Sequence, residues 1–202
     1  MLKRDRIQVI IFWEGSKVQE FKPQQLPYFI DNFRRQEFSG VINIQVEAPL
    51  LSQPRRRLFT FHQGWMTYTG TGLTTAQEFA ALLGRKFKVQ VMESAIQLAN
   101  KKVQDPQSIR EYLELFVRLK LFQWEDIEAF MQTKIIGTLE QLIPYGGKIY
   151  PEPDASFNFH YSDAQPGFHW GSLQPIYTKR QQQWAALVPV IPSIEAVPHV
   201  LD

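Results

Sequence analysis

Residues 38–70 constrain the fold of this chain more than any other segment. They contain three short runs of β-branched and aromatic residues, at 41–46, 58–61 and 65–68. Such runs are typical of β-strands, and Gly64 supplies the positive φ that a tight turn between the last two strands requires. We therefore predict three antiparallel strands that follow one another as a meander.

A short meander is not stable alone in water, so another segment must cover one of its faces. Residues 26–37 are predicted to form an amphipathic helix that does so, because apolar side chains recur there at helical spacing: Leu26, Phe29, Ile30 and Phe33. Pro27 is compatible with this helix since it falls in the first turn. Upstream, residues 7–13 are a candidate buried strand and residues 18–21 a candidate return strand.

Helical patterns dominate the middle of the chain. Thr74 and Thr75 are candidate caps of a helix that we predict to end at Gly84. Residues 89–91 alternate in polarity and predict a brief extended piece, and residues 94–102 predict another helix.

Two further helices are predicted after residue 104. Asp105 and Pro106 form a typical helix start, with Asp105 as the capping acceptor and Pro106 at the first helical position. The second helix spans about residues 124–143. Because only residues 120–123 join the two, we predict an antiparallel helical hairpin that packs on an apolar surface.

Strand signals return after these helices. Residues 148–150 and 156–161 are predicted to pair as a ribbon across a turn at residues 151–154, which Pro151 and Pro153 stiffen. A last helix at about 173–188 is predicted to bury one side: Tyr177, Trp184 and Leu187.

These elements predict an α+β fold, with a small antiparallel sheet that is covered by helices and interrupted by a helical hairpin insertion at about residues 74–145. A chain of 202 residues, 44% of them apolar, can bury a sizeable core in one domain. We place that domain at residues 1–190. Residues 191–202 are interpreted as an extended tail or the beginning of a linker.

Composition excludes several classes of protein. The absence of cysteine removes disulfide scaffolds, thiolate zinc sites and thiol nucleophiles. No apolar run approaches the ~20 residues of a membrane span, and the charged first residues lack the apolar region of a secretory signal. We therefore expect a cytoplasmic protein without membrane insertion.

No motif of catalysis or cofactor binding is present. The sequence has no GxxxxGK[ST], GxGxxG, HExxH or GxSxG, and its four histidines are scattered. His160, Asp163 and His169 lie close together in sequence, but their spacing is not that of a ligand motif and a fourth partner is missing. Glu152 and Asp154 are interpreted as exposed turn residues rather than as an acid–base pair. We therefore predict no enzyme, no metal and no cofactor.

The charge pattern suggests a different role. The net charge is only +2, yet the N-terminal half carries several basic runs. One of them, formed by Arg55, Arg56 and Arg57, is the predicted partner-binding region, together with exposed parts of the helical hairpin. The alternative is a nucleic-acid-binding module that uses nearby strand aromatics as a stacking platform. We favour the core for these aromatics, since a meander under a helix needs them there.

The order of motifs resembles the PATAN domain, the N-terminal module of cyanobacterial PatA-type response regulators. The resemblance begins with an amphipathic helix, FSGVINI and RRLFTFHQGWMTYTG, and continues with the two-helix segment REYLELFVRLKLFQWEDIEAFMQTKIIGTLEQLI. It ends with SFNFHY and RQQQWAALVPVIPSIEAVP. Each motif is loose, and the collinear order over about 190 residues carries the match.

The resemblance implies both a fold and a function. It implies an α/β core with a helical insertion, often followed in cis by a receiver domain. It also implies a non-enzymatic output module of a two-component system that binds other proteins and controls motility or phototaxis. The motor ATPase of the type IV pilus and other signalling proteins are the partners it suggests. It supplies no catalytic residue.

Overall fold

The computed structural model describes residues 18–48, 53–153 and 166–187. These ranges form five strands and six helices of an α+β fold, which confirms the predicted fold class. In chain order the elements are β1 (Gln19–Phe21), α1 (Leu26–Arg35), β2 (Gly40–Val46), β3 (Arg55–His62), β4 (Trp65–Gly70), α2 (Ala76–Phe87), α3 (Met92–Lys102), α4 (Ile109–Arg118), α5 (Trp124–Leu142), β5 (Gly147–Pro153) and α6 (Trp170–Leu187).

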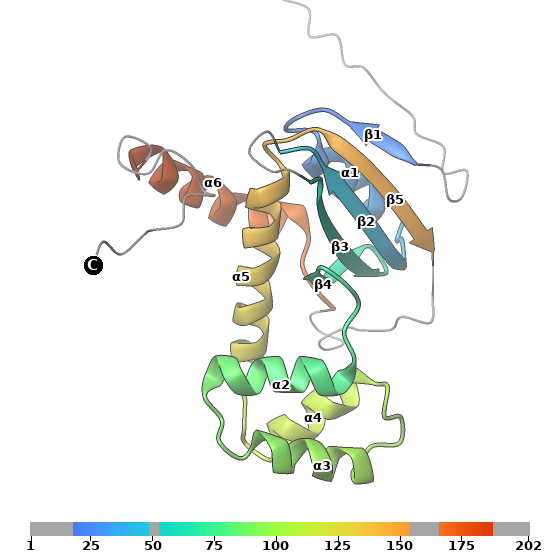
Figure 1. Cartoon of the computed structure of the whole chain (residues 1–202), viewed down its shortest axis with the longest axis vertical. Helices are drawn as coiled ribbons and strands as arrows, with labels where there is room; N and C mark the ends of the chain where they lie inside the picture. The colour runs from blue at the N-terminus through green and yellow to red at the C-terminus, as the bar shows by residue number, and fades with distance from the viewer. Residues whose placement is uncertain (1–17, 49–52, 154–165, 188–202) are drawn as a thin grey trace, which may run out of the picture.

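The strands form one antiparallel sheet in the order β1-β5-β2-β3-β4. The predicted meander is confirmed as β2, β3 and β4, and the predicted strand at 18–21 as β1. After β4 the chain leaves the sheet, forms four helices and returns as β5 between β1 and β2 (Figure 1). The predicted strand at 7–13 lies outside the described residues.

Helix α1 covers the sheet as the sequence predicts. Its four apolar residues are buried, and the Phe33 ring lies 5.6 Å from that of Phe61 and 5.0 Å from that of Phe38. The turn between β3 and β4 packs against the end of this helix. Gly64 there has a φ of +80°, and a Cβ on it would lie 2.6 Å from the carbonyl oxygen of Arg34.

The predicted turn at residues 151–154 is wrong, because residues 151–153 continue β5. Pro151 pairs in register with Ile42 of β2, and Pro153 with Gly40. Proline has no N–H to donate, so it fits a strand only where one edge needs no donor. On its other edge β5 meets β1 only up to Ile149, and the two prolines follow that point. The second strand of the predicted ribbon, at 156–161, lies outside the described residues.

Helix α2 begins as predicted and ends later than predicted. Thr75 and Glu78 form a capping box at its start. Gly84 does not end the helix but lies buried inside it, and a Cβ there would meet the Met92 Cγ at 2.3 Å. The glycine is therefore a point of close packing between α2 and α3. The extended piece predicted at 89–91 is also wrong, since these residues form the turn that leads into α3.

Helix α4 begins three residues after the predicted position. Its cap is Ser108, whose hydroxyl accepts a hydrogen bond from the Glu111 backbone N–H at 3.2 Å. The Glu111 carboxylate in turn accepts from the backbone N–H groups of Gln104 and Asp105. Asp105 accepts from the Gln107 N–H, so Asp105 and Pro106 belong to the preceding turn rather than to the helix.

Helices α2, α3 and α4 form a cluster at one end of the molecule, and α5 runs from it back to the sheet (Figure 1). The principal neighbours of α4 are α2 and α3. The predicted hairpin, in which α4 would pack mainly on α5, is therefore wrong. Helix α5 packs against β4, where the Lys134 ammonium lies 5.3 Å from the centre of the Tyr68 ring.

Helix α6 is the least buried of the helices described. Leu173 alone is fully buried, Tyr177 and Trp184 are half-buried, and Leu187 is 45% exposed. The Arg180 guanidinium is 2.8 Å from the carboxylate of Glu140, a buried residue of α5. Beyond this ion pair the helix extends past α5, away from the sheet (Figure 1). Of the three residues predicted to be buried, Tyr177 and Trp184 are therefore only half-buried, and the prediction is wrong for Leu187. None of the described helices has the length and apolarity that crossing a bilayer requires.

Candidate docking surface

The three arginines predicted to bind a partner lie at the start of β3. Arg55 is only 9% exposed, and its Nη1 donates to the backbone carbonyl of Gln141 at 3.2 Å. Arg57 donates from Nη2 to the side-chain carbonyl of the same glutamine at 3.1 Å. Backbone carbonyls at the end of a helix carry partial negative charge, so Arg55 stabilises the C-terminal end of α5 directly, and Arg57 contacts it through the Gln141 side chain.

Arg56 differs from its two neighbours. Side chains alternate between the faces of a strand, so Arg56 points away from α5, and it is exposed. The structure thus places one of the three predicted residues where a partner can reach it without disturbing the fold. Partner binding by the three arginines stays a prediction.

The aromatic platform of the nucleic-acid alternative does not form from the proposed rings. Phe59 and Phe61 are at most 1% exposed, and Tyr68 is also buried. Trp65 is half-buried beside the Arg34 guanidinium, which lies 5.3 Å from its ring centre. Bases stack only on exposed ring faces. The prediction that these aromatics belong to the core is confirmed for Phe59, Phe61 and Tyr68 but not for Trp65.

His169 has a structural role at the start of α6. Its Nδ1 accepts from the Ser172 backbone N–H at 3.2 Å and lies 3.3 Å from the Arg34 Nη1. Burial and the Arg34 charge lower the pKa of His169, and Asp31 opposes them. The neutral ring, with its proton on Nε2, fits both contacts. The other two candidate metal ligands, His160 and Asp163, lie outside the described residues.

The remaining candidate acidic pair is not brought together within the described chain. Glu152 accepts from the Asn43 side chain at 2.8 Å on the exposed part of the sheet, and Asp154 lies outside the described ranges. In those ranges no three His, Cys, Asp or Glu side chains are grouped so that they would hold a metal ion.

The helical end of the molecule carries two hollows that the sequence did not predict. The first, which we call the α3–α4 groove, has a volume of about 670 Å³. Its apolar floor consists of Leu98, Val103, Leu115 and Leu119. Leu98 is 38% and Leu119 42% exposed, so apolar surface is presented to solvent there. Two basic and two acidic residues also line it: Lys102, Arg118, Glu111 and Glu114.

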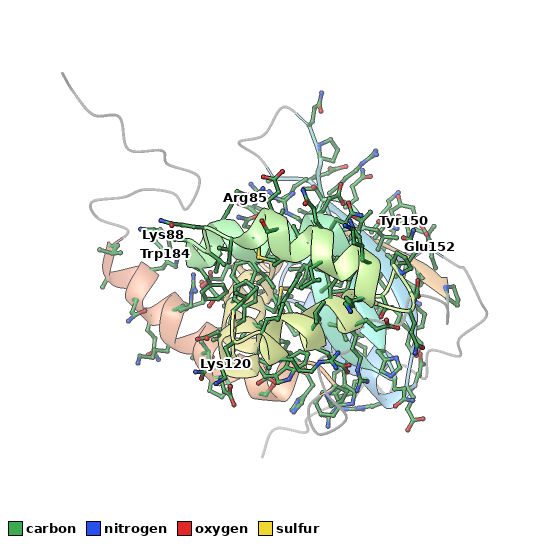
Figure 2. All side chains as sticks on the ribbon, turned by 90° about the horizontal axis from the view of Figure 1, so that it is seen from below. Arg85, Lys88, Lys120, Tyr150, Glu152 and Trp184 are labelled. Atoms are coloured by element: carbon green, nitrogen blue, oxygen red, sulfur yellow. The ribbon has the colours of Figure 1, made fainter. Side chains whose placement is uncertain are left out.

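A second hollow, the α2–α3 groove, lies between the neighbouring pair of helices and has a volume of about 560 Å³. Met92 and Ile96 contribute apolar surface, and Arg85 and Lys88 line it as well. Figure 2 looks onto this helical end and shows Arg85, Lys88 and Lys120 on the side away from Tyr150 and Glu152 of the sheet. The insertion therefore presents two grooves with apolar surface that are also lined by basic and acidic side chains.

The sequence held a weak signal for these grooves. Lysine and arginine recur in the last turns of α2, α3 and α4. Cations at helix C-termini are expected from the helix dipole alone, so the pattern did not distinguish a binding surface from ordinary helix ends. Leucine at helical spacing is typical of buried helix faces, so the sequence does not reveal that the groove leucines are exposed.

Comparison with known proteins does not assign this chain to a class, so the class rests on the fold alone. No family model, no curated protein and no solved structure matches the chain. The described residues define an α+β domain whose sheet is interrupted by a four-helix insertion.

Proposed function

We propose that this chain is a non-enzymatic protein-interaction module, the output module of a two-component response regulator. The resemblance to PATAN domains is one support, since that family has an α/β core with a helical insertion. The observation that carries the proposal is the helical end, where exposed leucines line a groove with cations at its edges. Burying such leucines against a partner is favourable, and charged edges orient the partner.

The proposed partner is the motor ATPase of the type IV pilus, with other signalling proteins of the motility system as further candidates. The setting is cytoplasmic, and a receiver domain in cis regulates the contact through phosphorylation. The described fold is compatible with such regulation. Helix α5 connects the helical end to the sheet, so it is the element through which we propose that a change at the sheet reaches the grooves.

The proposal is tested by titrating the full chain with the purified motor ATPase in a calorimeter, alongside motility and phototaxis assays in cells. Replacing Leu98 and Leu119 by aspartate is expected to weaken binding about tenfold or more, because charges replace buried apolar contacts. Leu73→Asp is the matched control, since Leu73 is 55% exposed and lies outside both grooves.

Circular dichroism of each variant verifies that the fold is intact. If the ATPase does not bind, or if binding and motility survive the double replacement, the proposal is wrong. Arg56→Glu tests the predicted arginine region separately. The triple replacement of Arg55, Arg56 and Arg57 is unsuitable, because two of these residues hold the end of α5.

A further inference from the structure

Charged side chains surround the apolar lining of the α3–α4 groove. Four ionic side chains border it, two acidic and two basic: Glu111, Glu114, Lys102 and Arg118. Whether these charges cancel within the protein determines what kind of partner fits.

The two carboxylates are already engaged within the protein. Glu111 Oε2 accepts from the backbone N–H of Gln104 at 2.6 Å and from that of Asp105 at 3.2 Å. Glu114 Oε1 pairs with Arg110 Nε at 2.8 Å. These acids therefore hold α4 and its preceding turn. Glu114 is paired with Arg110, whereas the Glu111 carboxylate keeps its charge and faces backbone N–H groups.

The two cations have no carboxylate partner within the described part of the chain. Arg118 makes one long hydrogen bond, from Nε to the Glu114 backbone carbonyl at 3.4 Å, and Lys102 makes no hydrogen bond or ion pair to a described residue. The groove thus offers an apolar lining beside two cations that pair with no carboxylate of the described residues. Its complement is apolar on one face and acidic beside that face.

The side chains that line the groove recur along it with helical spacing. Leu115 of α4 and its C-cap residue Leu119 are four residues apart, as are Leu98 and Lys102 on α3, so each helix presents one side chain per turn. Side chains on a partner helix recur with the same period, and helices laid into apolar grooves use it. An extended peptide presents side chains at about 7 Å intervals on one face and matches less well.

We propose that the α3–α4 groove binds an acidic amphipathic helix of the partner protein, with the apolar face of that helix on the floor and its Glu or Asp side chains beside Lys102 and Arg118. This inference rests on the proposed function, because it specifies the partner surface of the same interaction. It excludes a basic helix, which would bring like charges together at both edges.

The test uses displayed peptides of about 16 residues, roughly four helical turns, selected against the full chain. Leucine is fixed along one face, and the flanking positions vary among Glu, Lys and Gln. We expect Glu to be enriched beside the leucine face. Lys102→Glu together with Arg118→Glu is expected to weaken the selected peptide about tenfold in fluorescence polarisation and to shift a new selection toward Lys.

A matched control separates the groove from general electrostatics. Arg85→Glu together with Lys88→Glu changes the charge by the same amount in the neighbouring α2–α3 groove. This pair is expected to leave peptide affinity within about twofold, since exposed charges at a distance are screened by salt. Equal weakening by both pairs, enrichment of Lys on the unmodified chain, or no enriched sequence overturns the inference.

The ATPase titration distinguishes this inference from the proposed function. If Lys102→Glu with Arg118→Glu leaves ATPase binding intact while Leu98→Asp with Leu119→Asp abolishes it, the function stands and the acidic helix is wrong. If the peptides behave as expected and the ATPase does not bind, the groove and its ligand chemistry stand, and the proposed partner is wrong.

Discussion

At the scale of single residues, the turn between β3 and β4 depends on a glycine for two independent reasons. Gly64 has a φ of +80°, and a Cβ would lie 2.6 Å from the Arg34 carbonyl oxygen, which is backbone and has no easy way to move. We expect Gly64→Ala to lower the free energy of unfolding by about 2–4 kcal/mol, the sum of left-handed strain and displacement of α1.

Gly72→Ala is the control for this prediction. No atom lies within 4 Å of the position its Cβ would take, so its effect should stay within about 0.5 kcal/mol. Urea denaturation followed by tryptophan fluorescence measures both variants. Similar midpoints for the two would show that the close approach of Gly64 to α1 is not important for stability.

Residue identities also explain which helix ends were predictable. Helices α1, α2 and α4 are followed by left-handed residues, and these are Glu37, Lys88 and Lys120 rather than glycine. After each of them, a backbone N–H reaches a carbonyl of the preceding helix, as in Phe38 to Phe33 and Leu121 to Phe116, both at 3.0 Å. Glycine is the usual sequence signal of such a helix end. Because these three ends have no glycine, the sequence does not indicate them, and the end that it predicts at Gly84 is wrong.

At the scale of elements, a polar contact joins the three helices of the cluster. Asn100 of α3 accepts with Oδ1 from the Gln77 side chain of α2 at 3.1 Å and from the Tyr112 hydroxyl of α4. Tyr112 is 1% exposed, so loss of this acceptor leaves its hydroxyl without solvent access. We expect Asn100→Ala to destabilise the chain by about 1–3 kcal/mol.

Tyr112→Phe should cost less, because Asn100 is exposed and water replaces the lost donor. The double variant should be less destabilised than the sum of the two, with a coupling of about 0.5 kcal/mol or more. Chemical denaturation of the four proteins gives this cycle directly. Additive effects would mean that the contact does not contribute to holding α4 on α3.

Elements with local signals were predicted, and elements placed by distant pairing were not. Strands β2 to β4 and helix α1 could be predicted from the spacing of apolar residues and from the turn at Gly64. All of these signals lie within about 45 residues. Strand β5 inserts between β1 and β2 after four helices, and its prolines imitate a turn. The position of a strand in a sheet depends on partners far away in sequence, which period alone does not reveal.

At the scale of the whole molecule, the candidate site was predicted only in part. The sequence indicated the basic run at Arg55 to Arg57 and the helical insertion, and the structure gives them different roles. Arg55 and Arg57 bind Gln141 near the C-terminal end of α5, whereas the exposed apolar surface lies at the far end of the insertion (Figure 1). Charge is visible in a sequence, but whether an intramolecular partner already neutralises it depends on the tertiary structure.

The junction of α1, β4 and α6 makes stability depend on pH through His169. Its ring contacts Arg34 of α1 and lies 5.1 Å from the ring of Trp65 of β4, while its Nδ1 caps α6. The pKa of His169 is lowered by burial first and by Arg34 second, so the folded state favours the neutral ring. Stability from this group is therefore present above the unfolded pKa of about 6.5 and declines as pH falls below it toward the folded pKa.

Replacement by asparagine, which caps helices without titrating, isolates this effect. Between pH 7.5 and pH 5, values that bracket the ordinary histidine pKa of about 6.5, the urea midpoint of the unmodified chain should fall more than that of His169→Asn. A parallel variant, His62→Asn, is needed as well. Burial also lowers the pKa of His62, so protonation of His62 likewise destabilises the folded chain as pH falls. If His169→Asn retains the full pH dependence and His62→Asn removes it, the junction is insensitive to protonation and the contact between His169 and Arg34 does not hold α6 in place.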